Sequence, residues 1–336
     1  MEETMMKLSV RVFTTLFLTV CLFGLGVGQS LAADKPIVLK AVNINPPTHP
    51  YHLGFEILKA ELEKQSNGRL QLELFHSGQL GNERETIEQV ILGSVDLVVT
   101  ASAPWANFVS DLMVFDLPFI FRDRPHAYKV LDGPIGQSLS KGIGKEGLVF
   151  LGFWENGFRH VSNSKREVHV PADLKGMKIR LMENPIHLDT FKALGALPMP
   201  MAWTEVFTAL QQGTIDAIEN SPIIYTSNNL NEVQKYLSLT GHFYSPAVFV
   251  MNERSFNRIP EDLQKLILQV AEETKHKHRK IHEDSDDVNI EILKKKGMII
   301  TEVDKQPYID AVMPLYQEYG KKLKVEEILK QIIETK

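Results

Sequence analysis

Apolar residues near the start of the chain switch between the spacing of strands and the spacing of helices. Residues 69–75 alternate apolar and polar positions, which places Leu70, Leu72 and Leu74 on one face of a half-buried strand. The full pattern predicts strands over 36–44, 69–75 and 95–100 and amphipathic helices over 51–65 and 83–92. Strands and helices in this order form two successive βαβ units.

The same alternation returns in the middle of the chain, between residues 174 and 222. Its first strand, 177–181, carries Arg180 near the point where the strand ends, and its last strand is followed by Glu219 and Asn220. The segments between them are a helix over 188–194, a short strand, a helix over 203–212 and a strand over 214–218. Ligands of open α/β sheets bind at the carboxyl ends of strands. Arg180 and Asn220 therefore predict an anion pocket, although a lone strand arginine more often lies on a solvated face.

Two loops of the N-terminal part also follow strand ends and hold polar candidates. The first, residues 45–50, contains His49, and the second contains Ser102 and Trp105. Both loops are placed to contact a solute that enters from a facing domain. For His49 the alternative is a merely solvated loop histidine.

A single long helix is expected over residues 261–296, where no proline or glycine interrupts the sequence. Its apolar residues keep one helical phase: Leu263, Leu266, Ile267, Val270, Ile281, Val288 and Ile292. At 1.5 Å per residue the helix would extend about 50 Å and cross both domains. His278 and His282 stand four apart in its polar middle, but no third metal ligand is in register, so a solvated face is expected there.

The first 32 residues have the features of a secretory signal peptide. Lys7 and Arg11 form a basic start, residues 12–28 are apolar, and Ser30-Leu31-Ala32 offers a small-x-small cleavage site after Ala32 or Ala33. The alternative is an uncleaved membrane anchor. The only cysteine lies within this segment. An exported protein would therefore have no thiol, which excludes disulfides, thiolate catalysis and cysteine-bound metals.

Size, charge and motifs restrict the function further. The residues that follow the signal peptide are enough for two domains of ordinary size, and the net charge of −5 gives no basic patch for nucleic acid. The sequence contains no G-x-S-x-G, H-E-x-x-H or Walker A motif and no dinucleotide fingerprint. A periplasmic enzyme stays open as a second hypothesis because architecture alone does not exclude chemistry.

Five segments together resemble the DctP-type periplasmic solute-binding proteins of tripartite ATP-independent periplasmic (TRAP) transporters. In sequence order they read SGQLGNERETIEQVILGSVDL, DLPFIFRDRPHAY, ENGFRHVSNSKREV, KIRLMENP and MAWTEVFTALQQGTIDAIEN. The resemblance covers nearly the whole exported chain. It implies that Arg180 forms the main salt bridge to the solute's carboxylate, assisted by Arg159 and Asn220. For Arg159 the alternative is a structural ion pair with an acidic neighbour.

The resemblance also implies a two-lobed α/β fold of the periplasmic-binding-protein type, with a mixed sheet in each lobe and the long helix as a third connection. We expect residues 33–156 and 246–285 in lobe I and residues 157–245 and 286–336 in lobe II. The receptor would be periplasmic, close around a solute, need no cofactor or metal, and deliver the solute to two membrane permease subunits. A binding protein of an ATP-driven importer is an alternative with similar lobes but no such helix.

Two residues that follow Arg180 favour a sugar acid, such as a uronate or aldonate, as the solute. Glu183 is expected at the pocket mouth, where it would repel a second carboxylate and accept hydrogen bonds from hydroxyl groups. Trp203 on the same rim suits the C–H face of a sugar, although a core aromatic at a helix start is its alternative. With His49 as a further polar contact, a monocarboxylate is expected, and a C4-dicarboxylate or other organic acid is the alternative.

Overall fold

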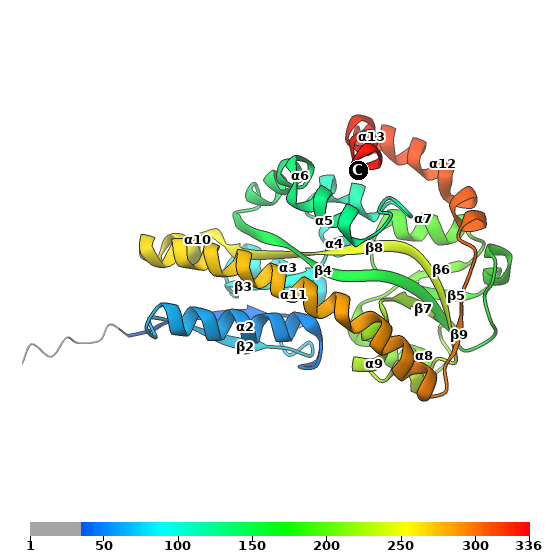
Figure 1. Ribbon diagram of the computed structural model, residues 1–336, viewed down its shortest axis with the longest axis horizontal. Helices are drawn as coiled ribbons and strands as arrows, with labels where there is room; N and C mark the ends of the chain where they lie inside the picture. Colours follow the sequence, from blue (N-terminus) through cyan, green and yellow to red (C-terminus); the bar gives the residue numbers. More distant parts are fainter. Residues whose placement is uncertain (1–34) are drawn as a thin grey trace, which may run out of the picture. The chain divides into compact units, whose positions relative to one another are not determined.

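A computed structural model describes residues 35–336 of the chain, and residues 36–336 form one compact unit (Figure 1). The predicted signal peptide lies outside the described residues. None of the helices within residues 35–336 combines the length and the apolar character needed to cross a bilayer. The predicted α/β fold class is confirmed, because helices alternate with the strands of a mixed sheet.

The N-terminal strands and helices form as their periodicity predicts. They are β1 (Ile37–Val42), α2 (Pro50–Gln65), β2 (Leu70–Phe75), α3 (Glu83–Leu92) and β3 (Leu97–Ala101). Strand β1 pairs in parallel with β2 on one side and with β3 on the other. Helix α3 begins at a capping box between Asn82 and Glu85 and ends at Gly93, which has a φ of 83°. We call β2-β1-β3 the first strand group.

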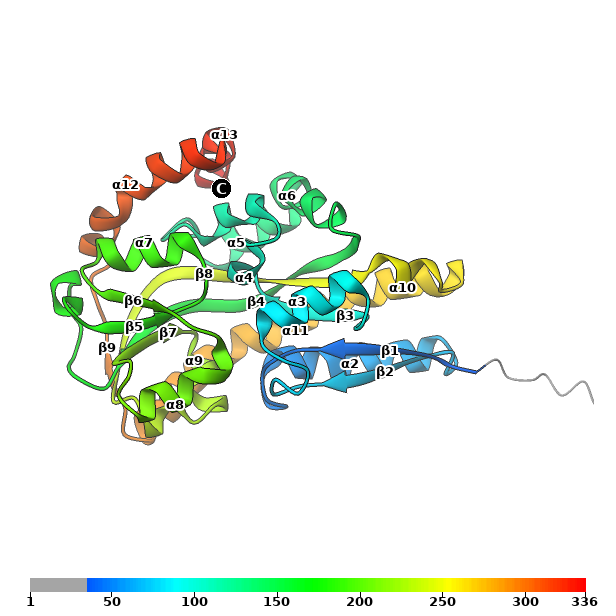
Figure 2. The same ribbon diagram turned by 180° about the vertical axis from the view of Figure 1, so that it is seen from behind.

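A second parallel strand group is built from the middle of the chain. It comprises β5 (Lys178–Leu181), α7 (Pro185–Ala193), β6 (Leu197–Pro200), a 3₁₀ turn η3 (Trp203–Glu205), α8 (Val206–Gln211) and β7 (Ala217–Asn220). Strand β5 pairs in parallel with β6 and with β7. We call β7-β5-β6 the second strand group. The two groups lie on either side of a long central pair of strands (Figures 1 and 2).

That central pair is β4 (Leu148–Asn163) and β8 (Tyr236–Asn252), which run antiparallel and join both groups into one sheet. The strand order is β2-β1-β3-β8-β4-β7-β5-β6, and β9 (Ile299–Thr301) pairs with β8. The sequence predicts strands over 148–154 and 244–252 here, and both predicted strands were too short, because β4 and β8 continue through the junction. The register shifts between Glu155 and Gly157, where Gly157 has a φ of 85°, so a bulge bends the strand without ending it.

Helix α11 (Glu261–Lys295) is the predicted long helix, and it runs from the α2 side to the α9 (Pro222–Ser227) side of the sheet (Figure 1). Its first half buries apolar residues as expected, including Ile267 and Val270. In its second half the buried face is polar up to Asn289, and Leu293 is the buried apolar residue near its end. Val288 is 57% exposed, whereas His278 and His282 are fully buried, so the predicted apolar phase and the solvated histidine face were both wrong here.

The histidines of α11 are buried because the helix packs on β4 at the junction. His278 Nδ1 lies 3.1 Å from the Pro50 carbonyl oxygen, and its Nε2 lies 3.2 Å from the backbone N–H of Glu155. Burial lowers the pKa of His278 to about 3, so its ring is neutral and bonds with both nitrogens. The Cβ of any residue other than glycine at position 157 would lie 2.6 Å from His282 Cε1, so glycine is required there.

The remaining helices cover the sheet. They are α4 (Ser102–Trp105), η1 (Ser110–Asp116), α5 (Arg124–Asp132), α6 (Pro134–Gly144), η2 (Pro171–Leu174), η4 (Leu230–Glu232), α10 (Glu253–Asn257), α12 (Gln306–Leu323) and α13 (Glu326–Glu334). Helix α12 packs on α7. Helix α13 instead returns to α6, and Arg122 donates to the carbonyl of Ile333. Helix α13 therefore contacts α6, which lies among the residues expected in lobe I, as well as α12.

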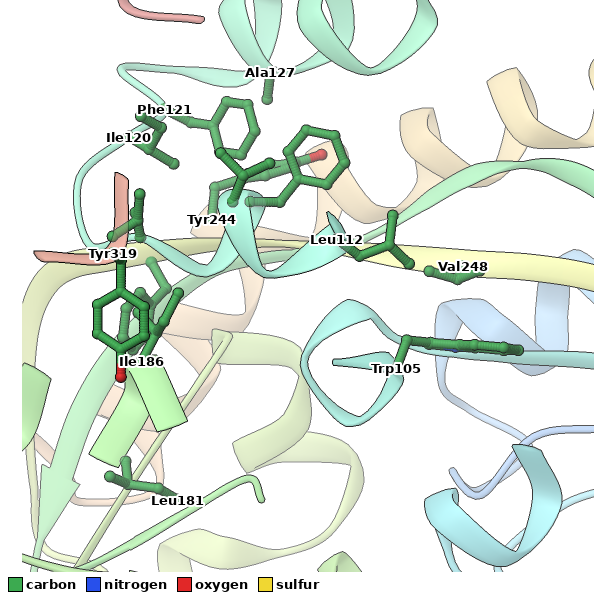
Figure 3. Packing of buried hydrophobic residues seen from close by; sticks show 14 of the residues in the cluster. Trp105, Leu112, Ile120, Phe121, Ala127, Leu181, Ile186, Tyr244, Val248 and Tyr319 are labelled. Carbon is green, nitrogen blue, oxygen red and sulfur yellow. The ribbon is translucent and has the colours of Figure 1, made fainter. Parts of the chain in front are cut away.

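One apolar core runs under these helices and along the central strands (Figure 3). Phe121 and Tyr244 pack edge to face with ring centroids 5.4 Å apart, and Tyr319 joins the same cluster from α12. Trp105 is fully buried and donates from Nε1 to Thr100 Oγ1 at 2.9 Å. The loop tryptophan is thus a core residue, and it does not line the cavities described below.

Candidate functional site

Two adjoining cavities lie where the first strand group faces the second. The inner cavity has about 290 Å³ of empty space, and its polar lining comes from both groups: Asn45, Tyr51, Glu83, Asn156, Arg159, Arg180 and Asn220. The outer cavity, of about 350 Å³, shares Glu83 and Arg180 with it and adds Arg84 and Glu183. These volumes include space that is open to solvent, and the shared lining residues show that the two cavities adjoin.

Arg180 lies in the inner cavity because strand geometry turns it away from its neighbours. Ile179 and Leu181 are fully buried on the opposite face of β5, and Arg180 itself is only 2% exposed. Its Nε donates to the Met201 carbonyl at 2.8 Å, and its guanidinium carbon lies 5.5 Å from the Trp203 ring. Among residues 35–336, its terminal nitrogens have no hydrogen-bond acceptor and no carboxylate lies within 4.0 Å. Burial lowers the pKa of Arg180, because the charge has been removed from water without a partner.

Arg159, on β4, is also buried, but unlike Arg180 it is paired with a carboxylate. It makes four hydrogen bonds: from Nε to Glu219 Oε2 at 2.5 Å, from one Nη to Asn220 Oδ1 at 2.9 Å, and from the other Nη to the carboxylate and the carbonyl of Glu219. Burial opposes its charge, but the Glu219 carboxylate raises the pKa of Arg159 above its ordinary value. The structural ion pair that was the alternative for Arg159 is therefore present, although one side of the residue still lines the inner cavity.

A histidine completes the network around Glu219. His242 Nε2 lies 3.3 Å from Glu219 Oε2, and its Nδ1 lies 2.7 Å from Thr240 Oγ1. Burial would raise the pKa of Glu219, but Arg159 holds it well below its ordinary value. Asn220 is oriented by this network, because its Oδ1 accepts from Arg159 and from the Ser221 N–H. Its Nδ2 has no partner in the described part of the chain, which leaves two donors for the cavity.

His49 lies outside both cavities, whereas its neighbour Tyr51 lines one of them. His49 is fully buried and caps α2 by accepting from the Tyr51 N–H at 3.1 Å, and it is not among the residues that line either cavity. Tyr51, which the sequence did not single out, lines the inner cavity, and its hydroxyl has no partner within residues 35–336. Burial raises the pKa of Tyr51 well above its ordinary value, so the hydroxyl keeps its proton and is a donor.

Ser102 also lies in the interior, away from both cavities. Its hydroxyl donates to Asp116 Oδ1 at 3.1 Å, and the other oxygen of Asp116 accepts from Asn184 Nδ2 at 2.8 Å. Asn184 is the N-cap of α7, so this buried cluster fastens the second strand group to α4 and η1. Of the seven predicted site residues, Ser102 and His49 are thus not brought to the cavities.

Glu183 and Trp203 line different cavities. Glu183 is exposed and lines the outer cavity beside Arg180. Trp203 is half-buried and lines the inner cavity on one side and a further cavity of about 750 Å³ on the other. It also packs against the apolar cluster of α8 and β7, so the core role considered as its alternative is present as well.

Glu83 and Asn156 are cavity residues that sequence reasoning missed. Glu83 is the first residue of α3 and lines both cavities. Asn156 lies at the bulge of β4, where the strand passes between the two groups. No grouping of three or more potential metal-ligating side chains occurs within residues 35–336.

Comparisons with known proteins agree on the type of protein. Residues 41–322 match the family model of the bacterial extracellular solute-binding proteins, family 7, DctP. The 2,3-diketo-L-gulonate-binding periplasmic protein YiaO of Escherichia coli K12 is 37% identical over 266 residues, which are 79% of this chain and 81% of that protein.

Solved structures of TRAP periplasmic solute-binding proteins are similar over nearly their whole length. The protein of Polaromonas sp. JS666, bound to D-erythronate, has a TM-score of 0.86 and 42% identity, with 89% of this chain and 99% of that chain covered. The protein of Sulfurospirillum deleyianum DSM 6946, with bound succinate, has the same TM-score and coverage at 30% identity.

Proposed function

This chain belongs to the DctP family, family 7 of the bacterial extracellular solute-binding proteins, and is a TRAP-type solute receptor; we propose that its solute is a sugar acid with one carboxylate. The resemblance seen in the sequence is thereby confirmed at the level of the family. Family members are transport receptors, so the proposal concerns binding and not turnover. The unpaired, buried guanidinium of Arg180 is the observation that carries it.

Arg180 supplies what a single carboxylate needs. Its terminal nitrogens form a planar fork that bonds two carboxylate oxygens at once, and its Nε is already fixed by Met201. A solute carboxylate would neutralise a charge that is otherwise buried alone. Asn220 offers two further donors beside it, held in place by the Arg159–Glu219 pair.

The rest of the inner cavity favours hydroxyl groups on the solute. Tyr51 offers a hydroxyl donor that has no partner among residues 35–336, and Asn45 and Asn156 add side-chain amides to the lining. Hydroxyl groups both donate and accept, so several of them on a short carbon backbone satisfy such a mixed lining. The solutes in the names of two relatives, D-erythronate and 2,3-diketo-L-gulonate, have this character and support the proposal.

A C4-dicarboxylate is the second candidate, because the Sulfurospirillum protein holds succinate at similar overall structure. The inner cavity of this protein, however, has one free arginine and not two within the described residues, since Arg159 is already paired with Glu219. A second carboxylate would meet amides, a phenol and the Glu83 carboxylate. We therefore place dicarboxylates second.

The inner cavity is lined by residues of both strand groups, so separation of the groups would widen the entrance for the solute. The elements that join them are the β4–β8 pair, α11 and α13, and motion about these connections would close the cavity over the solute. We propose that the closed receptor, exported to the periplasm by its signal peptide, then delivers the solute to two membrane permease subunits.

A ligand screen tests the proposal directly. Thermal shift against aldonates, uronates, succinate and malate, followed by calorimetry and mass spectrometry of any co-purified ligand, should rank sugar monoacids first. Small-angle scattering with the best ligand should give a smaller radius of gyration than without it. Tight binding of succinate together with no heat from any sugar acid would contradict the proposed solute class while leaving the family assignment unchanged.

A further inference from the structure

Glu83 presents a carboxylate to the same cavity into which Arg180 presents its guanidinium. The two side chains line both the inner and the outer cavity, and they come from different elements, α3 and β5. Within the described residues, the Glu83 carboxylate has no hydrogen-bond donor and no cation within 4.0 Å, and Arg180 has no carboxylate within that distance. Two opposite charges thus face one space without forming a pair.

This arrangement differs from that of the two fully buried glutamates. Glu219 and Glu155, which are fully buried, are each bonded to an arginine: Arg159 for the first and Arg124 for the second. Burial raises the pKa of Glu83, whereas Arg180 and Arg159 act in the opposite direction without contact. A half-buried carboxylate kept apart from a nearby free cation is costly unless a third group joins them.

A sugar acid could bond to both the Arg180 guanidinium and the Glu83 carboxylate. Its carboxylate would pair with Arg180, and hydroxyl groups on its other carbons would donate to Glu83. An ammonium group would also donate to Glu83, but it accepts nothing, whereas Tyr51 and the cavity amides offer donors that need acceptors. Hydroxyl groups fit the whole lining better than an ammonium group does.

We propose that Glu83 is the residue that selects polyhydroxy monoacids over dicarboxylates, by accepting hydrogen bonds from solute hydroxyls and repelling a second carboxylate. The inference rests on the proposed function and deepens it. The sequence suggested Glu183 as the residue that repels a second carboxylate, and we assign that role to Glu83 instead. Glu183 is exposed and lines only the outer cavity, where water screens its charge, whereas Glu83 lines the inner cavity itself.

The test compares Glu83→Gln with wild type and with Glu73→Gln by calorimetry. Glu73 lies on β2 and is exposed, and it has no ion pair among residues 35–336, so its change removes one charge from the same strand group without touching the cavity. Each protein is titrated with D-glucuronate, D-erythronate, L-malate and succinate at one pH and salt concentration.

Glu83→Gln should bind the better sugar acid about tenfold more weakly, because a charged acceptor is replaced by a neutral one. Its affinity for malate or succinate should rise by at least as much, because a repulsive charge is lost. The preference ratio should therefore fall about 100-fold, while Glu73→Gln keeps the wild-type ratio. The unliganded variant should melt no lower than wild type, since an unpaired carboxylate has been removed.

The wild-type titrations separate this inference from the proposed function. If the wild-type protein prefers a dicarboxylate, both proposals are overturned. If it prefers a sugar acid, and the preference ratio of Glu83→Gln is within twofold of the wild-type ratio, only the role of Glu83 is overturned. A uniform loss for all four acids, or a lowered melting temperature, would mean that Glu83 supports the fold and does not select the solute.

Discussion

Arg159 and Arg180 are buried on β4 and β5, which are separated in the sheet by β7 alone, yet their surroundings are opposite. Arg159 is bonded to Glu219 and Asn220 and belongs to a closed network that continues to His242. Arg180 has one backbone acceptor, an aromatic neighbour and an open space. The difference teaches that burial alone does not identify a binding arginine. We therefore expect the buried cation without a partner among the described residues to be the one that binds a solute.

The largest expected effect is on stability, at the paired arginine. Arg159→Met should destabilise the protein by about 3 to 5 kcal/mol, because it leaves the Glu219 carboxylate buried with only His242 beside it. Arg180→Met, the matched change at the unpaired site, should leave stability unchanged or slightly higher, because no buried group loses a charged partner. Urea unfolding of the two ligand-free variants measures the contrast. Equal losses in both variants would remove the distinction between the two arginines.

The second effect is on affinity, at the unpaired arginine. Arg180→Lys keeps the charge but not the planar fork, and the loss of one bond of a desolvated pair costs about 2 to 5 kcal/mol. Calorimetry with the best sugar acid should therefore show at least about 30-fold weaker binding. Circular dichroism of the variant should match wild type. An affinity within twofold of wild type would exclude Arg180 as the carboxylate partner.

Acid pH should reduce the stability that the Arg159–Glu219 pair contributes. The folded-state pKa of Glu219 is depressed, so its contribution to stability is complete above its unfolded value of about 4.3 and is lost as the pH falls below that value. The slope from this group is at most about 1.4 kcal/mol per pH unit. The stability difference between wild type and Glu219→Gln should therefore shrink between pH 4.5 and pH 3. A constant difference over that range would show that Glu219 is not ionised in the folded protein.

The separate strands and helices on either side of the central pair were predictable from sequence, because the patterns that indicate them lie within single elements. The capping box of α3 and the alternating leucines of β2 each lie within one element, and both elements form as expected. The central strands were predicted too short. Gly152 and Gly157 in β4, and Gly241 and Pro246 in β8, are residues that usually mark strand ends. Here register shifts beside these residues let the strands continue, and pairing between strands that are distant in sequence keeps each strand extended.

The candidate site was predictable only where a strand end marks it. Arg180 and Asn220 follow from the α/β rhythm, and the structure brings both to the inner cavity. Glu83 and Tyr51 lie in the first turns of helices whose sequences look like ordinary surface and core, so nothing local indicates a cavity. His278 and His282 were expected in solvent because their neighbours are charged. They are buried because α11 crosses β4, which the spacing of one helix does not reveal.

The smallest expected effect concerns Trp203, which lies beside the unpaired arginine and has no counterpart beside the paired one in the described part of the protein. Its ring lies 5.5 Å from the Arg180 guanidinium carbon, and a contact of this kind contributes about 0.5 to 1 kcal/mol at a partly exposed site. The ring also offers an apolar face to a sugar. Trp203→Leu should therefore weaken binding of a cyclic uronate by about three- to tenfold and binding of the acyclic acid D-erythronate less, while Trp203→Phe keeps most of both affinities. Calorimetry with the two acids checks this. Equal affinities for the leucine and phenylalanine variants would show that Trp203 serves only the apolar cluster behind it, and the selectivity of the cavity would then depend on its polar groups alone.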